Sequence, residues 1–322
     1  MSRARLYRNG VLEAEGFPVS EVSEHVRDPS ATVWFDLCAP SEAELAAIGE
    51  ALGLHPLSVE DVLQEQQRPK LDVYDSHLFL TVYALTLDAT GTLRHCEVDV
   101  FLTANAMVTV RENDLLDIDA VTHRWDAARE RAGQGVAFLL HGLLDYVVDG
   151  HLQVAEELDD RVEELEDLLF DDRPQGHHLQ RRTFELRKTM LRLRRVTKPM
   201  RDLVDGLDRR ELGMIGADMA PYFRDVYDHV LRVSELNESM RELLGNVRET
   251  YLTLQGNRMN AIMKKVTSWA AIIAVPTSIT GFFGQNVPFF GYGLPSGLWI
   301  SVLLMVVTSV SLYVVFRKWD WL

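Results

Sequence analysis

The C-terminal part of the chain contains two apolar runs, VTSWAAIIAVPTSITGFF (266–283) and LWISVLLMVVTSVSLYVVF (298–316), on either side of the tripeptide Gly284-Gln285-Asn286. Each run is long enough for a helix that crosses about 30 Å of hydrocarbon. The intervening residues, 284–297, are too few for another domain. The two runs therefore predict a hairpin of membrane-spanning helices with both chain ends on the same side.

Basic residues flank this hairpin at its two outer ends. Lys264 and Lys265 precede the first run, and Arg317 and Lys318 follow the second. Because Lys and Arg concentrate in cytoplasmic segments, both termini are expected in the cytoplasm, with residues 317–322 as a basic cytoplasmic tail. We therefore expect a multi-pass protein of the cell inner (plasma) membrane, in contact with the lipid bilayer.

One side of the first run is small and polar for a helix in lipid. Steps of three or four residues keep to one helix face, and here they connect Asn260, Met263, Thr267, Ala270, Ala274, Thr277 and Gly281. A polar face in the membrane lies against another helix or against water. One such face encloses no water by itself, whereas a ring of identical chains would surround a polar conduit.

Two other interpretations remain open from the residues alone. The hairpin could anchor a cytoplasmic scaffold that transports nothing, and the small residues could serve close helix packing, as Gly, Ala, Ser and Thr do in membrane bundles. Asn260 weighs against both, because neither an anchor nor close packing needs an amide near the membrane boundary.

Short motifs are spread along nearly the whole chain. The N-terminal part contains GLHPL (53–57), EDVL (60–63) and QRPK (67–70), and PYFRDVYDH (221–229) opens the last long helical segment. Gly281, Gly284 and Asn286 end the first apolar run, and RKW (317–319) follows the second. Together these motifs resemble the CorA family of divalent-cation transport proteins. The chain departs from the family's Gly-Met-Asn signature at its middle position, which is Gln285.

The resemblance implies a fold and an activity. The fold is an α+β cytoplasmic domain followed by long α-helices and a C-terminal two-helix transmembrane hairpin, assembled into a CorA-like funnel as a homopentamer. The activity is divalent metal cation transport, with Mg²⁺ influx through a channel-like pore that cytoplasmic Mg²⁺ gates. Because Gln285 departs from the signature, Co²⁺, Ni²⁺ or Zn²⁺ remains an alternative cargo, as in the family's zinc-transporting branch.

Magnesium holds its waters at about 2.1 Å and sheds them reluctantly, so neutral oxygens that bind the hydration shell suit its pore. In the pentamer that the resemblance implies, Met263 is the expected hydrophobic constriction. The expected pore and selectivity residues are Asn260, Met263, Thr277, Gly281, Gly284, Gln285 and Asn286. Asp88 and Asp225 resemble the family's pair of carboxylates that hold a regulatory Mg²⁺ between subunits. Two solvated surface aspartates are the alternative.

The chain also divides by pattern. Residues 1–130 are expected to form the cytoplasmic α/β domain, with strands at 32–37, 77–87, 98–102 and 107–110. There, Ser41 and Glu44 form a capping box that opens a helix, and Gly53 closes it. Residues 131–220 predict a long helical hairpin, because 156–172 holds ten carboxylates and one base whereas 181–201 holds nine bases and one acid. The remaining segments are the stalk and first transmembrane pore helix (221–283), an outer loop (284–297) and the second transmembrane helix (298–316).

Composition bounds the partners. The 322 residues carry a formal charge of −15, which disfavours nucleic acid as a partner and suits a cation-handling protein. Cys38 and Cys96 lack CxxC spacing and fit a reducing cytosol, and residues 1–20 show no apolar export signal. The sequence contains no Gly-rich phosphate loop and no His, Asp or Glu cluster with catalytic spacing, so an enzyme is not expected.

Overall fold

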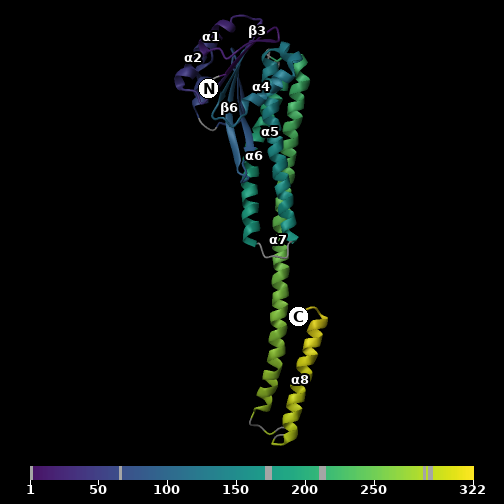
Figure 1. Ribbon diagram of the computed structural model, residues 1–322. Helices are drawn as coiled ribbons and strands as arrows, with labels where there is room; N and C mark the ends of the chain where they lie inside the picture. The colour runs from purple at the N-terminus through teal and green to yellow at the C-terminus, as the bar shows by residue number, and fades with distance from the viewer. Residues whose placement is uncertain (1–2, 65–66, 171–175, 210–214, 286–287, 289–292) are drawn as a thin grey trace. The chain divides into compact units, whose positions relative to one another are not determined.

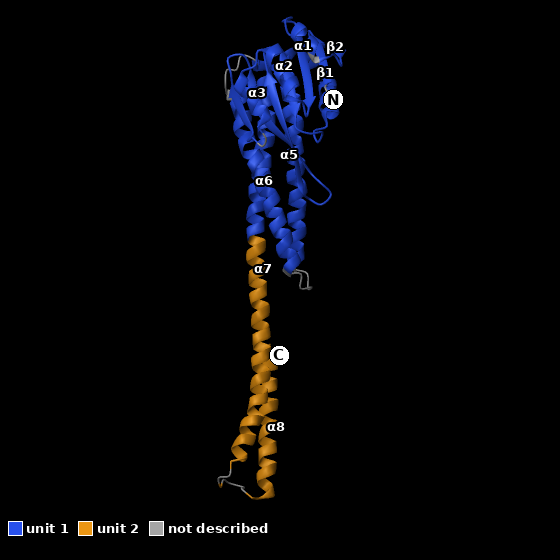
Figure 2. Ribbon diagram, turned by 90° about the vertical axis from the view of Figure 1, so that its left-hand side faces the viewer, with its two compact units in different colours: residues 1–245 blue, residues 246–322 orange. Residues whose placement is uncertain are grey.

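The computed structural model describes residues 3–64, 67–170, 176–209, 215–285, 288 and 293–322. The chain divides into two compact units, residues 1–245 and residues 246–322 (Figure 2). The boundary falls inside one continuous helix of 64 residues, α7. The helices are α1 (Val19–His25), α2 (Glu42–Leu52), α3 (Pro56–Leu63), α4 (Ile118–Ala127), α5 (Val136–Asp167), α6 (Gly176–Arg209), α7 (Ala220–Phe283) and α8 (Pro295–Lys318), with short 3-10 turns at Arg129–Gln134, Leu168–Phe170 and Ala217–Met219.

The first unit is built on a seven-stranded mixed sheet of order β2-β1-β3-β7-β6-β5-β4. Its strands are β1 (Arg3–Arg8), β2 (Val11–Glu15), β3 (Ala31–Cys38), β4 (Lys70–Val73), β5 (Leu78–Leu87), β6 (Leu93–Leu102) and β7 (Ala106–Arg111). The pair β3 and β7 is parallel and the other neighbouring pairs are antiparallel. The four predicted strands correspond to β3, β5, β6 and β7, whereas β1, β2 and β4 lie outside the predicted strands.

Helices cover both faces of this sheet (Figure 1). On one face, Phe35, Phe79 and Phe101 form a core with residues of α1, α2 and α3. On the other face, α4 and α5 pack over a second core that contains Trp34 and Trp125, whose rings meet edge to face at 4.8 Å. Because successive strand residues point to opposite faces, one sheet supplies both cores and fixes the long α5 helix to the domain.

The predicted capping box is confirmed at the start of α2. The Ser41 N–H donates to Oε2 of Glu44 at 2.9 Å, and the Glu44 N–H donates to Oγ of Ser41 at 3.3 Å. Gly53 closes the helix with a φ of 63°, a left-handed conformation in which a Cβ would be unfavourable. Local sequence therefore determines both ends of α2.

The predicted acidic and basic helices pack against each other as α5 and α6. Among the residues described, one ion pair joins these two helices, between Nη2 of Arg182 and Oε2 of Glu164 at 3.0 Å. The N-terminal half of α7 contacts both helices: Nδ2 of Asn237 donates to the carbonyl oxygen of Met190 in α6 at 3.2 Å, and Nη2 of Arg232 lies 3.7 Å from Oε1 of Glu156 in α5. Most charged side chains described on α5 and α6 therefore form no ion pair between these two helices.

The second unit contains the C-terminal part of α7 and the whole of α8, and these two helices run side by side (Figures 1 and 2). Both helices contain a stretch long and apolar enough to cross a membrane, with mean hydropathies of 1.5 and 2.3. The predicted apolar runs lie within these helices. Only 6% of each stretch is buried inside the chain, as expected where lipid or further chains supply the cover.

Candidate functional site

The polar stripe predicted on the first apolar run lies along α7 and is open in the single chain. Asn260, Thr277 and Gly281 are exposed, and Met263 exposes 56% of its surface. The intervening stripe residues are exposed as well: Thr267, Ala270 and Ala274.

The opposite side of α7 is covered. Within residues 266–283 the buried or half-buried side chains are Ser268, Ala271, Ile272, Val275, Pro276, Ile279 and Phe283. An α-helix turns by about 100° per residue. Around the axis of α7, the mean direction of these covered side chains therefore lies roughly 150° from the mean direction of the polar stripe. Since α8 is the neighbouring helix of this unit (Figure 2), α8 leaves the stripe uncovered.

The hydroxyl of Thr277 shows what the stripe offers chemically. Its Oγ1 donates its proton to the carbonyl oxygen of Ile273 at 3.0 Å. A hydroxyl has one proton and two acceptor lone pairs. With the proton committed to the helix, Thr277 presents an acceptor to the exposed side, and an acceptor is what the water shell of a cation requires.

The two glycines near the end of α7 differ in their surroundings. A Cβ built on Gly284 would lie 2.9 Å from the carbonyl oxygen of Thr280, so the chain itself excludes a side chain there. A Cβ on Gly281 would meet nothing within 4 Å. Gln285 is exposed and its N–H donates to the carbonyl oxygen of Phe282 at 3.3 Å. Asn286, the third predicted mouth residue, lies outside the described residues.

At the other end of the stripe, Asn260 lines a hollow of about 580 Å³ together with Thr267 and two residues of the C-terminal tail, Asp320 and Trp321. The ring of Trp321 stacks on Phe316, with centroids 5.7 Å apart. The segment predicted as a basic tail therefore also brings a carboxylate, Asp320, toward the polar stripe.

Asp88 directly follows β5, in the turn to β6. Its Oδ1 accepts the Thr90 hydroxyl at 2.6 Å, the Thr90 N–H at 2.9 Å and the Thr92 N–H at 3.0 Å. These bonds, that of the Thr90 hydroxyl first, hold the pKa of Asp88 below its ordinary value. Asp88 is therefore an ionised turn residue whose Oδ2 receives none of these bonds.

Asp225 is exposed on the second turn of α7. Among the residues described, no hydrogen bond or ion pair joins it to Asp88. The two carboxylates were predicted to meet between neighbouring chains, and that meeting stays a prediction.

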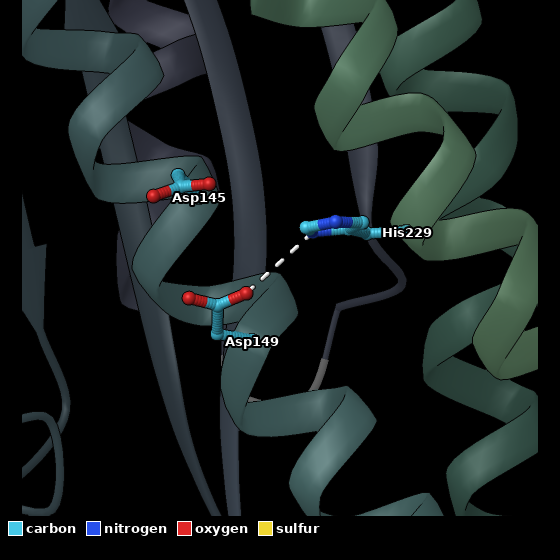
Figure 3. Close-up of side chains that lie close together, drawn as sticks. All are labelled: Asp145, Asp149 and His229. Atoms are coloured by element: carbon cyan, nitrogen blue, oxygen red, sulfur yellow. Dashed lines mark ion pairs between the residues drawn. The ribbon is translucent and has the colours of Figure 1, made fainter.

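A cluster that the sequence patterns did not single out lies between α5 and α7. Asp145, Asp149 and His229 place one ligand atom each within 4.8 Å of one another (Figure 3). Nδ1 of His229 is buried and lies 3.5 Å from Oδ1 of Asp149. Arg124 of α4 already pairs with the other side of the cluster, at 2.6 Å from Asp145 and 2.7 Å from Asp149.

This cluster has the donor atoms of a cation site. Carboxylate oxygens suit Mg²⁺, and an added imidazole nitrogen favours Co²⁺, Ni²⁺ or Zn²⁺. A cation there would share the two carboxylates with the Arg124 guanidinium. The spacing of Asp145 and Asp149, one helical turn apart, was the signal available in the sequence, but nothing local linked that turn to His229.

Comparison with known proteins places the chain among metal-ion transporters. The family model described as CorA-like Mg²⁺ transporter protein matches residues 29–318. YfjQ of Bacillus subtilis is 34% identical over 298 residues, which cover 88% of this chain and 91% of that protein. The cobalt/magnesium transport protein CorA of Thermotoga maritima is 29% identical over 311 residues, 92% of this chain and 85% of that protein. The solved structure of the CorA magnesium transporter from Methanocaldococcus jannaschii matches with a TM-score of 0.80 and 22% identity, over 100% of this chain and 99% of that one.

Proposed function

Because the chain belongs to the CorA family of Mg²⁺ transporter proteins, we propose that it transports divalent metal cations across the cell membrane, with Mg²⁺ entering through a homopentameric pore. The observation that carries this proposal is the uncovered polar stripe of α7. A membrane anchor gains nothing from such a face, whereas five copies around an axis turn it into the wall of a conduit.

The chemistry of the stripe suits a hydrated cation. Mg²⁺ keeps most of its waters in protein sites, and those waters donate hydrogen bonds. Acceptors from Asn260 and Thr277 meet that need without the negative charge that would strip the shell. Gly281, Gly284, Gln285 and Asn286 continue the conduit to its outer mouth, and Met263 forms its hydrophobic constriction.

The membrane potential supplies the driving force. A divalent cation that enters an inside-negative cell gains about 4.6 kcal/mol per 100 mV, at about 2.3 kcal/mol for each charge. Uptake by this route needs no coupled ATP hydrolysis.

Cytoplasmic Mg²⁺ regulates the pore through Asp88 and Asp225. A carboxylate pair between neighbouring chains repels itself, and a cation between the two converts repulsion into a bridge. The free Oδ2 side of Asp88 and the exposed position of Asp225 support this role. Bound Mg²⁺ then holds the closed ring together, and its loss releases the pore toward the open state.

Cobalt is the second candidate cargo. The Thermotoga maritima relative is named a cobalt/magnesium transport protein, and Gln285 puts a second amide at the outer mouth, where the Gly-Met-Asn signature has a methionine. Nickel and zinc belong in the same test.

Uptake into proteoliposomes tests the proposal. Full-length protein is placed in liposomes that hold a divalent-sensitive dye, and Mg²⁺, Co²⁺, Ni²⁺ and Zn²⁺ are compared under an inside-negative potential. Thr277→Val removes a stripe acceptor, and Asn286→Ala removes the mouth amide. Thr308→Val on α8 is the matched control, because its hydroxyl also donates to a helix carbonyl, that of Leu304 at 2.6 Å.

We expect Thr277→Val to lower Mg²⁺ uptake at least fivefold, since each lost hydrogen bond is worth roughly 1 kcal/mol, and Thr308→Val to match wild type. Uptake of zinc or nickel alone would move the chain to the other branch of the family. Failure of every ion to enter would favour the anchored scaffold.

A further inference from the structure

A groove of about 900 Å³ lies on the first unit, and its lining includes no residue of the polar stripe and none of the carboxylates described above. One wall is α6, and the other is formed by the β5–β6 hairpin with the residues that precede β4. The residues that matter are Arg68, Tyr83, His95, Arg192, Arg195 and Lys198. All of them belong to residues 67–199, so the groove is internal to one unit.

The positive charge of this groove is largely unpaired. Arg68, Arg192, Arg195 and Lys198 have no ion pair among the described residues, and Arg194 lies at 4.0 Å from Glu238, at the limit of an ion pair. No acidic residue is among those that line the groove, and Glu97, next to it on β6, accepts a hydrogen bond from the hydroxyl of the lining residue Tyr83 at 2.7 Å. In a chain of formal charge −15, five cations around one hollow need a physical explanation.

The groove also has flat apolar surfaces. The ring of His95 is exposed and tilted against the buried ring of Tyr83, with centroids 5.9 Å apart and an interplanar angle of 53°. Pro69, Pro199 and neighbouring leucines complete the lining. A planar ring of a ligand would find an apolar wall here beside the cations.

We propose that this groove binds a polyphosphate anion, with a nucleoside triphosphate as its ligand class. The hollow has the size of small-molecule sites, which span about 300–1,000 Å³. Guanidinium groups match phosphate oxygens in bidentate geometry, and α6 presents Arg192 and Arg195 on the same wall as Lys198. The exposed His95 ring offers a stacking surface for a base.

This binding site is separate from the proposed pore and does not require transport. If the protein transports Mg²⁺ as proposed, anion binding at this site could regulate transport, because phosphates are major ligands of Mg²⁺. A transporter that also binds the free anion would respond to the supply of uncomplexed phosphate chains. That consequence rests on the proposed function, whereas binding itself does not.

Calorimetric titration of the purified full-length protein tests the site directly. The buffer is divalent-free, so that the anion cannot act by removing Mg²⁺ from the protein. Sodium tripolyphosphate, ATP and AMP are the probes. We expect saturable binding of tripolyphosphate and ATP, and binding of AMP at least tenfold weaker. ATP binding tighter than tripolyphosphate would add the base to the recognised chemistry, and equal affinity would assign recognition to the phosphate chain.

Charge reversal within one helix supplies the control. Arg192→Glu and Arg195→Glu line the groove, whereas Arg187→Glu makes the same charge change on an exposed position of α6 outside it. The groove variants should weaken ATP binding at least tenfold, and Arg187→Glu should stay within twofold of wild type. Circular dichroism checks that all three variants are folded, and Arg195→Gln provides a milder groove variant.

Three results would overturn the proposal. The first is the lack of saturable binding of tripolyphosphate and ATP at millimolar concentration. The second is an equal loss of binding in Arg187→Glu, which would reduce the effect to general surface charge. The third is the absence of anion binding together with a lower oligomer mass for Arg195→Glu in light scattering. In that case acidic residues of a second copy, such as those of Glu156–Asp167, fill the groove instead.

Discussion

Two buried groups of the first unit, Asp99 and His151, have pKa values shifted in opposite directions. Substituting one group at a time should separate their effects on the pH dependence of stability. Asp99 on β6 is 5% exposed and accepts the Thr81 hydroxyl at 2.6 Å. Burial raises the pKa of Asp99 from 3.8 to about 7. His151 on α5 is fully buried, and its Nε2 donates to the Tyr83 carbonyl oxygen at 2.6 Å. Burial lowers the pKa of His151 from 6.5 to about 4.

The two shifts have opposite signs in the pH dependence of stability. Between pH 3.8 and about 7 the folded chain keeps a proton on Asp99 that the unfolded chain releases, so stability falls as the pH rises. Between pH 6.5 and about 4 the unfolded chain protonates His151 while the folded chain does not, so stability falls as the pH decreases. At about 1.36 kcal/mol per pKa unit, each group contributes about 2 kcal/mol between pH 5 and pH 7, and the two nearly cancel.

Isosteric substitutions remove one titration at a time. Asp99→Asn keeps an acceptor for Thr81, and His151→Gln keeps a donor for the Tyr83 carbonyl. From pH 7 to pH 5, Asp99→Asn should lose about 2 kcal/mol of stability, roughly 4–8 °C in Tm, and His151→Gln should gain a similar amount. Thermal unfolding of the full chain, with hydrogen exchange of β5 and α5 amides to assign the transition to the first unit, measures both. Variants that keep the wild-type pH slope would refute the assignment of these two groups.

Three further substitutions test the site. Gly281→Ala adds a methyl to the stripe where nothing in the chain lies within 4 Å; since Ala is about 1 kcal/mol better than Gly in a helix, we expect normal folding and several-fold lower Mg²⁺ uptake, and unchanged uptake would remove Gly281 from the pore wall. Arg124→Gln removes the ion pairs of Arg124 with Asp145 and Asp149, so Mg²⁺ should raise the Tm of this variant more than it raises the Tm of wild type. A smaller rise would mean that Arg124 holds the two carboxylates in place for the cation instead of competing with it. Asp225→Lys should sustain uptake at internal Mg²⁺ concentrations that close the wild-type pore; closure at the wild-type concentration would exclude this carboxylate from regulation.

Local patterns predicted the elements that their own residues determine. Three features follow from the spacing of residues within one helix or strand: the capping box at Ser41, the strand β5 and the position of Thr277 on the uncovered side of α7. Because no contact with a distant segment is needed, the sequence alone predicts them. The strand β1 carried a weaker signal. Its apolar residues Ala4 and Leu6 alternate with arginines, so the run did not stand out by hydrophobicity.

The contacts that sequence reasoning missed join distant segments. His229 lies 80 positions after Asp149, and no pattern in either helix indicates the rotation that brings the two together. The groove beside Arg195 has the same origin. The sequence shows the basic run on α6, and the neighbouring acidic run on α5 offers partners of opposite charge for it. The structure instead gives that helix pair one ion pair among the described residues and turns other arginines toward the β5–β6 hairpin.

The exposure of the polar stripe is itself an argument for assembly. In water an exposed amide needs no partner, whereas in hydrocarbon an unsatisfied polar group is costly. Among the described residues, the side chain of Asn260 makes no hydrogen bond, and Gly281 has neither a close neighbour nor a left-handed φ that would require glycine. The described part of the single chain therefore supplies no reason for either residue. A neighbouring copy supplies both reasons at once, because small residues let identical helices approach and polar groups then face the water that the ring encloses. A lone hairpin would satisfy neither, so these two positions favour the ring over the anchor.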